Sequence, residues 1–233
     1  MVISAARGVA LITALLVVAL TTVLAVAMMT QQQLTIRRTM NLINRDQAYC
    51  YALGAEQWSQ QLLLRDDPEI DSLDEHWATP LPPLPIPGGS LQGQLEDLQA
   101  RFNLNNLILS TPESLTAELK FFERLLSVLE LPTSLAQVVL DWLDDDITPQ
   151  VPHGAEDDRY LIKTPAYRAA NGLFKSPSEI RLLAGIDAQK YEKLIPYIST
   201  LPTLTAININ TAPLPILRAL TDNLDEAQGQ QLI

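Results

Sequence analysis

Apolar and polar positions along the chain first predict one long helix near its start. Residues 8–36 carry no charged side chain, and their apolar part, residues 9–29, is long enough to cross a hydrocarbon core at about 1.5 Å of rise per residue. Apolar residues then recur at a three-four spacing as far as Gly54, and the first proline is Pro68. This pattern predicts one helix over residues 9–64, half membrane span and half packing element.

Residues 65–102 have the pattern of loops and short strands. Prolines crowd residues 81–89 and favour an extended path with few backbone hydrogen bonds. We therefore expect a connector there, followed by residues 90–102, where alternating apolar and polar positions could supply a strand or two.

Beyond residue 102 the pattern is helical and weakly repeats itself. Residues 102–106 and 207–211 are similar asparagine-containing segments, and each introduces a helical block. We expect two small helical modules, over residues 103–172 and 173–233. In the second module, Ser176 is placed to cap a helix that begins at the proline after it.

Composition and motifs narrow the classes of function. The net charge of -11 argues against a nucleic-acid partner, because phosphate binding needs concentrated Lys and Arg. The lone cysteine, Cys50, precludes a disulfide within the chain. The sequence lacks the motifs of serine hydrolases, zinc proteases and phosphate-binding loops, so we expect no enzyme. Paired carboxylates occur only in residues 141–160, where the sequence leaves a glycosidase arrangement open.

The acidic segment, residues 141–160, is the densest in candidate chemistry. Its carboxylates repel one another unless they spread into solvent or surround a cation. Oxygen ligands in a flexible loop suit calcium better than zinc, and a single imidazole, His153, without cysteine partners adds little to a zinc site. Two hypotheses remain: a calcium site and a solvated acidic loop.

Two segments raise the alternative of a membrane-anchored DNA-binding or DNA-uptake protein. Residues 183–186 and 207–211, each followed by a helix, resemble helix-hairpin-helix units, which present backbone N–H groups to phosphate. Asp187, however, stands where the second hairpin glycine should be, and a carboxylate repels phosphate. The surrounding sequence is acidic as well, which disfavours this alternative.

The residues before the apolar stretch resemble a type IV prepilin leader. The short polar leader ends in Gly8, directly before the apolar residues. A dedicated peptidase cuts prepilins after this glycine, so the resemblance implies cleavage between Gly8 and Val9 and methylation of Val9. An uncleaved signal anchor is the alternative.

A wider resemblance lies in the order and spacing of several segments. They are RGVALITALLVVAL near the start, ELPTSLAQVVLDWLDDD and GAEDDRYL around the acidic segment, then PAYRAANGLFKSPSEIRLL and the ININ-TA sequence. Together they resemble the protein K family of type II secretion systems, the large minor pseudopilins. The resemblance covers essentially the whole chain.

The resemblance implies an α+β, pilin-like fold. In that fold a long N-terminal helix packs on a small antiparallel sheet, and a large helical domain made of two SAM-like or helix-hairpin-helix-like modules is inserted into it. The implied domains are the prepilin leader (1–8), the transmembrane and stem helix (9–64), the loop and strand region (65–102) and the two helical modules (103–172, 173–233).

The resemblance also implies a role and a place in the cell. The chain would be a minor pseudopilin at the pseudopilus tip, where it initiates and caps assembly with the minor pseudopilins I and J for export of folded proteins across the outer membrane. A prepilin peptidase would process it. It would be a single-pass inner-membrane protein with its bulk in the periplasm and no nucleic-acid partner.

Site residues follow from the same resemblance. The family's calcium role is carried over to the acidic segment, and the matching positions are Asp144, Asp146, Glu156 and Asp157, extended to Asp141 and Asp158. Thr13 departs from most pilins, which have a glutamate at that place; a buried carboxylate needs a partner, and a tip subunit has none above it. A second departure is that the chain stops before the closing strands of the family, so we expect a fragment or a protein without those strands.

Overall fold

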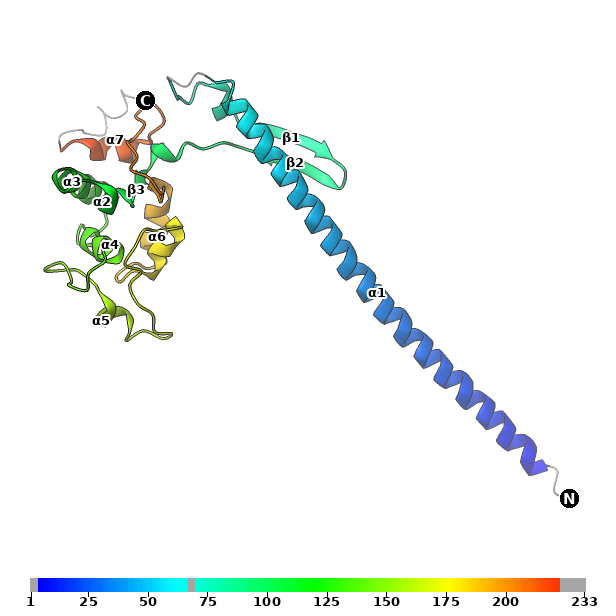
Figure 1. Cartoon of the computed structure of the whole chain (residues 1–233). Coiled ribbons are helices and arrows are strands. Elements are labelled where there is room, and N and C mark those ends of the chain that lie inside the picture. Colours follow the sequence, from blue (N-terminus) through cyan, green and yellow to red (C-terminus); the bar gives the residue numbers. More distant parts are fainter. Residues whose placement is uncertain (1–3, 67–69, 223–233) are drawn as a thin grey trace. The chain divides into compact units, whose positions relative to one another are not determined.

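The computed structural model describes residues 4–66 and 70–222, which fall into two compact units (Figure 1). The first unit contains the described residues up to Asp66 together with Leu81–Gly93. The second contains the intervening residues up to Pro80 and the chain from Gln94 onward.

The first unit is built on α1 (Ser4–Leu63), which confirms the predicted long N-terminal helix. The helix has no proline, and threonines such as Thr21 and Thr22 donate to backbone carbonyls of the preceding turn, so these hydroxyls need no partner outside the helix. From Val9 onward the helix is long and apolar enough to cross a membrane. Its apolar residues are exposed, as a lipid-facing surface requires.

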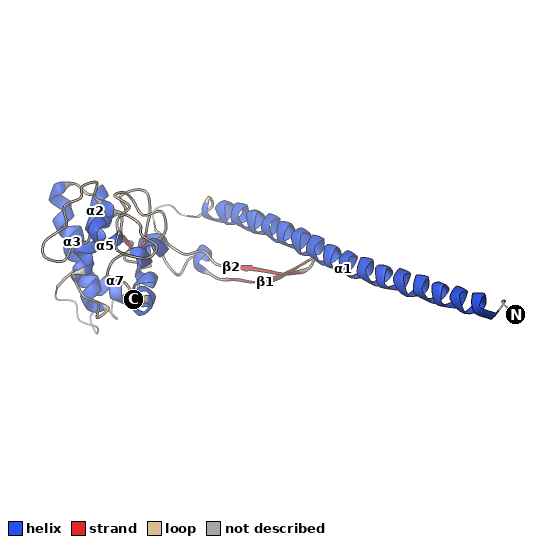
Figure 2. Cartoon of the chain, turned by 90° about the horizontal axis from the view of Figure 1, so that it is seen from below, coloured by secondary structure: helices blue, strands red, loops and turns tan. Residues whose placement is uncertain are grey.

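A β-hairpin accompanies α1 in the same unit. β1 (Leu81–Ile86) and β2 (Gly89–Gly93) pair antiparallel, with Leu84 opposite Leu91. Both views place the hairpin beside the C-terminal half of the helix (Figures 1 and 2). On that half, partly buried residues recur along one face, as expected where the hairpin covers the helix: Tyr51, Ala55, Ser59 and Leu62.

β1 corrects the prediction of an unpaired connector in the proline-rich segment. A register shift between Leu81 and Leu84 accommodates Pro82 and Pro83, which have no N–H to donate. Pro87 and Gly88 then form the turn, in which Gly88 takes a φ of +91° that favours glycine. Prolines are tolerated because β1 pairs with β2 alone in the described part of the chain.

The second unit contains several short elements around one core. Among its described residues, the 3₁₀ helices are η1 (His76–Ala78), η2 (Leu98–Ala100), η3 (Pro177–Leu182) and η4 (Ile195–Tyr197). The α-helices are α2 (Asn106–Leu109), α3 (Pro112–Val128), α4 (Leu135–Leu143), α5 (Asp157–Tyr160), α6 (Ala188–Leu194) and α7 (Leu214–Leu220). The strands β3 (Phe102–Asn103) and β4 (Ile198–Ser199) pair in parallel.

Both predicted helical modules contribute to that core. α3 of the first packs against α7 of the second, and Leu125 and Ile216, one from each, are fully buried. Ser176 caps η3 with a complete capping box, although the helix it begins is 3₁₀ rather than α. The boundary between the modules at residue 172 stays a prediction, and residues 223–233 lie outside the described part of the chain.

Three buried asparagines join distant segments of this unit. The side-chain amide of Asn105 exchanges hydrogen bonds with the backbone N–H and carbonyl of Phe174, at 2.9 and 3.0 Å. Asn106 makes the same exchange with Thr205, and Asn103 with Leu201. Each amide thus substitutes for a strand partner, which explains how polar side chains are accommodated in the core.

Candidate metal site in the acidic loop

The acidic segment is a loop held at both ends by short helices. α4 carries Asp141 in its last turn, and Asp144 follows as the C-cap. The loop then returns to Glu156, directly before the first residue of α5, and Tyr160 at the end of that helix is fully buried. Both ends of the loop are thus fixed in the core, while Asp145 and Asp146 between them are exposed.

Three of the carboxylates converge. One carboxylate oxygen each from Asp144, Asp146 and Glu156 lie within 4.8 Å of one another, and we call these residues the carboxylate trio. Glu156 is 3% exposed, and neither of its oxygens has a hydrogen-bond partner among the described residues; Oδ1 of Asp144 is buried and unpartnered in the same way. Such acceptors have lost water without gaining a donor, which is costly for a charged group.

The surroundings of the trio oppose its negative charge. Burial, together with repulsion from neighbouring aspartates, raises the pKa of the Glu156 carboxyl to about 7. Burial likewise raises the pKa of Asp144 to about 6, again with repulsion from nearby aspartates. A bound cation would offset both causes, because it supplies charge and coordination together. The carboxylate oxygens of the trio are therefore suitable ligands for a cation.

Asp141 has a different task. It is fully buried, and its carboxylate accepts hydrogen bonds from the backbone N–H groups of Gln150 and Ala155, the latter at 2.6 Å. Burial raises the pKa of Asp141, while these two bonds lower it. A Cβ on Gly154 would collide with Oδ2 of Asp141 and the backbone N of Gln150. Asp141 thus fixes the course of the loop around a position that only glycine fits.

Asp157 and Asp158 lie outside the trio. Oδ1 of Asp157 accepts a hydrogen bond from the backbone N–H of Ala169 at 3.0 Å, and Oδ2 lies 3.6 Å from the guanidinium of Arg168. Asp158 is exposed in the first turn of α5. Of the six carboxylates named from the sequence, the structure brings three together and gives Asp141 and Asp157 partners in the backbone.

The oxygen-only trio could bind a metal ion that prefers hard ligands. His153 contributes its backbone N–H to Oε1 of Gln137 at 2.9 Å, and its imidazole does not belong to the trio. Zinc, which favours nitrogen and sulfur, therefore has no ligand of its preferred kind in this group.

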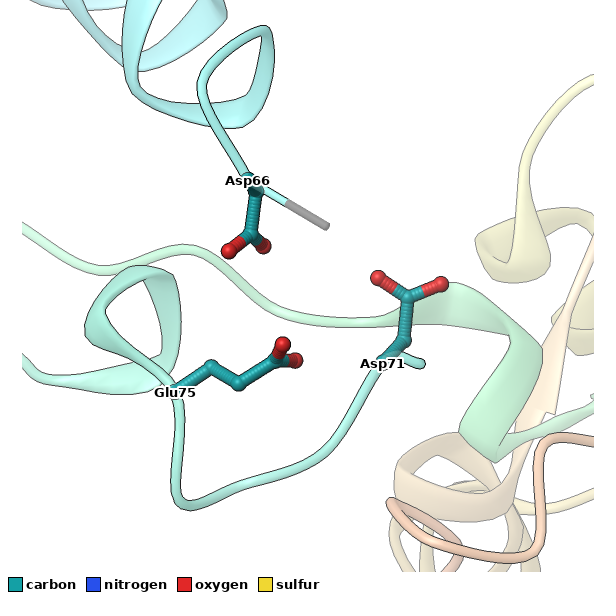
Figure 3. Close-up of side chains that lie close together, drawn as sticks. All are labelled: Asp66, Asp71 and Glu75. Carbon is teal, nitrogen blue, oxygen red and sulfur yellow. The ribbon is translucent and has the colours of Figure 1, made fainter. Parts of the chain in front are cut away.

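Glu75 shows how hydrogen bonds alone can occupy a carboxylate oxygen. Figure 3 shows Asp71 and Glu75 on one loop of the second unit, and Asp66, which belongs to the first unit. Oε2 of Glu75 accepts hydrogen bonds from the backbone N–H of Ser72 at 2.7 Å and from the indole N–H of Trp77 at 2.9 Å. Glu75 therefore has donors of the kind that Glu156 lacks.

In the segment that resembles a helix-hairpin-helix unit, the carboxylate of Asp187 occupies the start of α6. Gly185 takes a φ of +81°, and Asp187 caps α6 by accepting from the backbone N–H of Lys190 at 2.9 Å. Asp187 also pairs with the ammonium of Lys190 at 3.0 Å. The positions that a phosphate would occupy at this helix start are thus taken by Asp187. The predicted processing residues, Gly8 and Val9, both lie within α1.

Comparison with known proteins decides the family. Two sequence models of the type II secretion system (T2SS) protein K family match this chain, one over residues 100–203 and the other over residues 207–233. The type II secretion system protein K of Pseudomonas aeruginosa is 41% identical, over 97% of this chain and 71% of that protein. The chain belongs to the type II secretion system protein K family.

Further relatives agree. Type II secretion system protein K of Aeromonas hydrophila is 34% identical and that of Klebsiella pneumoniae 36%, each over 88% of this chain and 66% of the relative. The chain thus spans about two thirds of the length of these two proteins. Among solved structures, the GspK–GspI–GspJ complex of enterotoxigenic Escherichia coli contains a chain that matches with a TM-score of 0.73 and 28% identity, over 84% of this chain and 82% of that one.

Membership of the protein K family confirms the resemblance seen in the sequence. The shared architecture is a long N-terminal helix, small sheets and several helices. The family is a structural component of a secretion system, which agrees with the expectation that the chain is not an enzyme. It also favours the pseudopilin interpretation over the DNA-binding alternative.

Two features of this family member escaped the sequence analysis. The need for glycine at position 154 comes from the carboxylate of Asp141 and the backbone of Gln150, which the fold of the loop brings against it. The segment that contains the three core asparagines stood out only because it is similar to residues 207–211, and their burial was not predicted. Their density in a buried stretch, with Asn103, Asn105 and Asn106 between apolar neighbours, was the signal that could have revealed them.

Proposed function

We propose that this chain is a minor pseudopilin at the tip of the type II secretion pseudopilus. There it initiates and caps assembly with the minor pseudopilins I and J for the export of folded proteins across the outer membrane. The single observation that carries the proposal is the similarity, over 84% of this chain, to a chain of the solved GspK–GspI–GspJ complex. The two-unit architecture supports a finer description, in which a helical domain of two SAM-like or helix-hairpin-helix-like modules is inserted into a pilin-like unit.

The N-terminal helix supports a place in the inner membrane. Its exposed apolar residues from Val9 onward offer one span, and the rest of the chain would lie in the periplasm. The prepilin peptidase cuts between Gly8 and Val9 and methylates Val9. The helix is then free to pack laterally against the helices of other pseudopilins.

Thr13 supports the tip position. Its hydroxyl donates to the carbonyl of Ala10 at 3.0 Å, so the side chain has a hydrogen-bond partner within its own helix. It needs no partner from a neighbouring subunit. We expect Thr13→Glu to reduce secretion, because an unpaired carboxylate in the membrane is costly. Thr13→Val, which adds no charge, is the control and should secrete normally. Normal secretion by the glutamate variant would show that secretion does not require the absence of a charge at position 13.

The acidic loop supports a structural calcium site. Asp144, Asp146 and Glu156 would hold Ca²⁺, while Asp141, Asp157 and Asp158 shape the loop and add negative charge around it. Bound calcium would supply the positive charge that the buried oxygens lack. Its role would be to stabilise the domain.

Co-purification with the two partner pseudopilins tests the proposed assembly. The full chain is co-expressed with pseudopilins I and J and with the prepilin peptidase, then isolated from the inner membrane through a tag on this chain. We expect a stable complex that contains all three pseudopilins. Recovery of this chain without I and J, under conditions in which both are expressed and membrane-inserted, would contradict the proposal. Binding of duplex DNA with steep salt dependence would favour the rival interpretation.

A further inference from the structure

Charge is unevenly distributed along the second unit. The chain as a whole has a net charge of -11, yet residues 159–193 carry seven Lys and Arg against three Asp and Glu. This stretch is basic, whereas the residues before it in the second unit are acidic. A local excess of positive charge attracts an acidic partner and repels a basic one.

The same stretch exposes large apolar side chains. Ile162 is 79% exposed, and Leu161 and Leu182 are also exposed. The ammonium of Lys163 donates to the carbonyl of Leu182 at 3.1 Å, so the turn after α5 adjoins the end of η3. We name this surface the basic apolar patch, and its residues are Arg159, Leu161, Ile162, Lys163, Arg181 and Leu182.

Two positive charges of the patch are held against aromatic rings, and the acidic side chains of the described residues neutralise none of the three. Lys163 lies 5.1 Å from the ring centroid of Tyr167, and Arg181 lies 5.1 Å from that of Tyr191. Within the described part of the chain, Arg159, Lys163 and Arg181 take part in no ion pair. Their charges therefore remain available to a partner.

Nearby carboxylates are mostly occupied elsewhere. Asp157 accepts from Ala169 and pairs with Arg168. Glu179 closes the capping box by accepting from the backbone N–H of Ser176. Asp158 remains exposed beside Arg159. The surface thus combines a small apolar centre with a mainly basic rim, the arrangement typical of a protein docking site.

We propose that the basic apolar patch docks an acidic segment of another protein, one that carries apolar side chains among its Asp and Glu residues. Apolar side chains of that segment would cover Ile162 and Leu182, and its carboxylates would pair with Arg159 and Arg181. An anionic membrane is the less fitting occupant, because lipid-binding clusters generally gather about four to eight basic residues. This docking goes beyond the assembly with pseudopilins I and J and does not depend on it.

Site-specific photo-cross-linking in cells tests the docking. A photoreactive amino acid is placed at Ile162 or Leu182 of the full chain, and at the exposed Leu204, outside the patch, as a control. We expect both patch positions to yield an adduct with the same protein, mapped to an acidic segment, and Leu204 to yield none with it. Arg159→Glu combined with Arg181→Glu should lower the adduct at least tenfold. Lys175→Glu, an exposed charge reversal outside the patch, should change it less than twofold.

A charge swap completes the test. Replacing the cross-linked acidic residues of the partner with lysine should restore the adduct to the Arg159→Glu, Arg181→Glu variant. Adducts with phospholipid, with a second copy of this chain, or with a neutral or basic segment would overturn the proposal, as would a yield that ignores charge reversal. Co-purification of pseudopilins I and J is measured in the same strains and should stay unchanged, so that a failed docking is distinguishable from a failed assembly.

Discussion

Single carboxylates in the acidic loop differ in what surrounds them, and this difference separates their roles. Asp141 receives two backbone N–H donors and Asp157 receives one, together with the guanidinium of Arg168. Glu156 is buried without any donor among the described residues. A carboxylate with donors stabilises the loop by itself, whereas one without them requires a cation or a proton.

Glu156→Gln tests the role of the carboxylate that lacks donors. Without metal at pH 8, the free energy of unfolding of the variant should exceed that of the wild type by about 1 to 2 kcal/mol, because a buried charge is removed. The variant should therefore unfold at a higher denaturant concentration. Calcium at a hundredfold excess over its dissociation constant should stabilise the wild type by about 2.7 kcal/mol and the variant far less. Chemical denaturation with chelator and with calcium measures both effects.

The exposed Asp145→Asn variant is the matched control for Glu156→Gln, since it removes one charge from the same loop without touching the trio. It should keep most of the stabilisation by calcium. Equal stabilisation of Glu156→Gln and wild type would exclude Glu156 as a ligand.

Gly154→Ala tests the fit of the loop around Asp141. The added methyl group would displace the Asp141 carboxylate from its backbone donors, so we expect a loss of about 2 to 3 kcal/mol in the free energy of unfolding. Gly172→Ala, whose nearest neighbour would lie at an ordinary 3.8 Å, should change stability by less than about 0.5 kcal/mol. Similar stabilities of the two variants would mean that the loop adapts at position 154.

At this scale the sequence located the acidic segment but not the arrangement of its side chains. Charge density alone left a calcium site and a solvated acidic loop open in residues 141–160. It could not distinguish Glu156 from Asp157, because adjacent residues point in different directions and their donors come from distant positions such as Ala169. The selection of three carboxylates out of six is a product of tertiary structure.

Among the elements, the loop between α4 and α5 should make stability depend on pH. The folded pKa of Glu156 is raised from 4.5 to about 7 and that of Asp144 from 3.8 to about 6, so the folded state binds more protons than the unfolded state in this range. Without metal, stability should therefore fall as pH rises from about 5 to 8. Asp187, whose pKa is lowered, contributes its change at more acidic pH.

Urea denaturation at several pH values in chelator measures this dependence. The decline should be weaker in Glu156→Gln, and calcium should weaken it in the wild type because the cation favours the ionised form. A metal-free wild type that gains stability across the same range would contradict the pKa assignments.

Elements differ in how far the sequence predicted them. The helical spacing and the absence of proline before Pro68 were enough to predict α1, because these signals are local. β1 was missed, since its prolines argue against a strand until a register shift and a single partner strand accommodate them. Pairing of β3 with β4 joins residues nearly a hundred positions apart, and no local pattern announces it.

For the whole molecule, the two units correspond to two physical tasks. The first presents a helix with an exposed apolar surface, which suits lateral packing in a membrane. The second has its own buried core, the carboxylate trio and the basic apolar patch. Membership of the protein K family links these tasks to secretion. We propose that the first helix is released from its leader to assemble with other pseudopilins.

Mass spectrometry of the N-terminus tests that claim most directly. The chain is purified from the inner membrane of cells that contain the prepilin peptidase, with a peptidase-deficient strain as the control. We expect a mature chain that begins at Val9 and carries one methyl group on its terminal amine, found in a complex with pseudopilins I and J. A chain that still begins at Met1 in the peptidase-containing strain would contradict it.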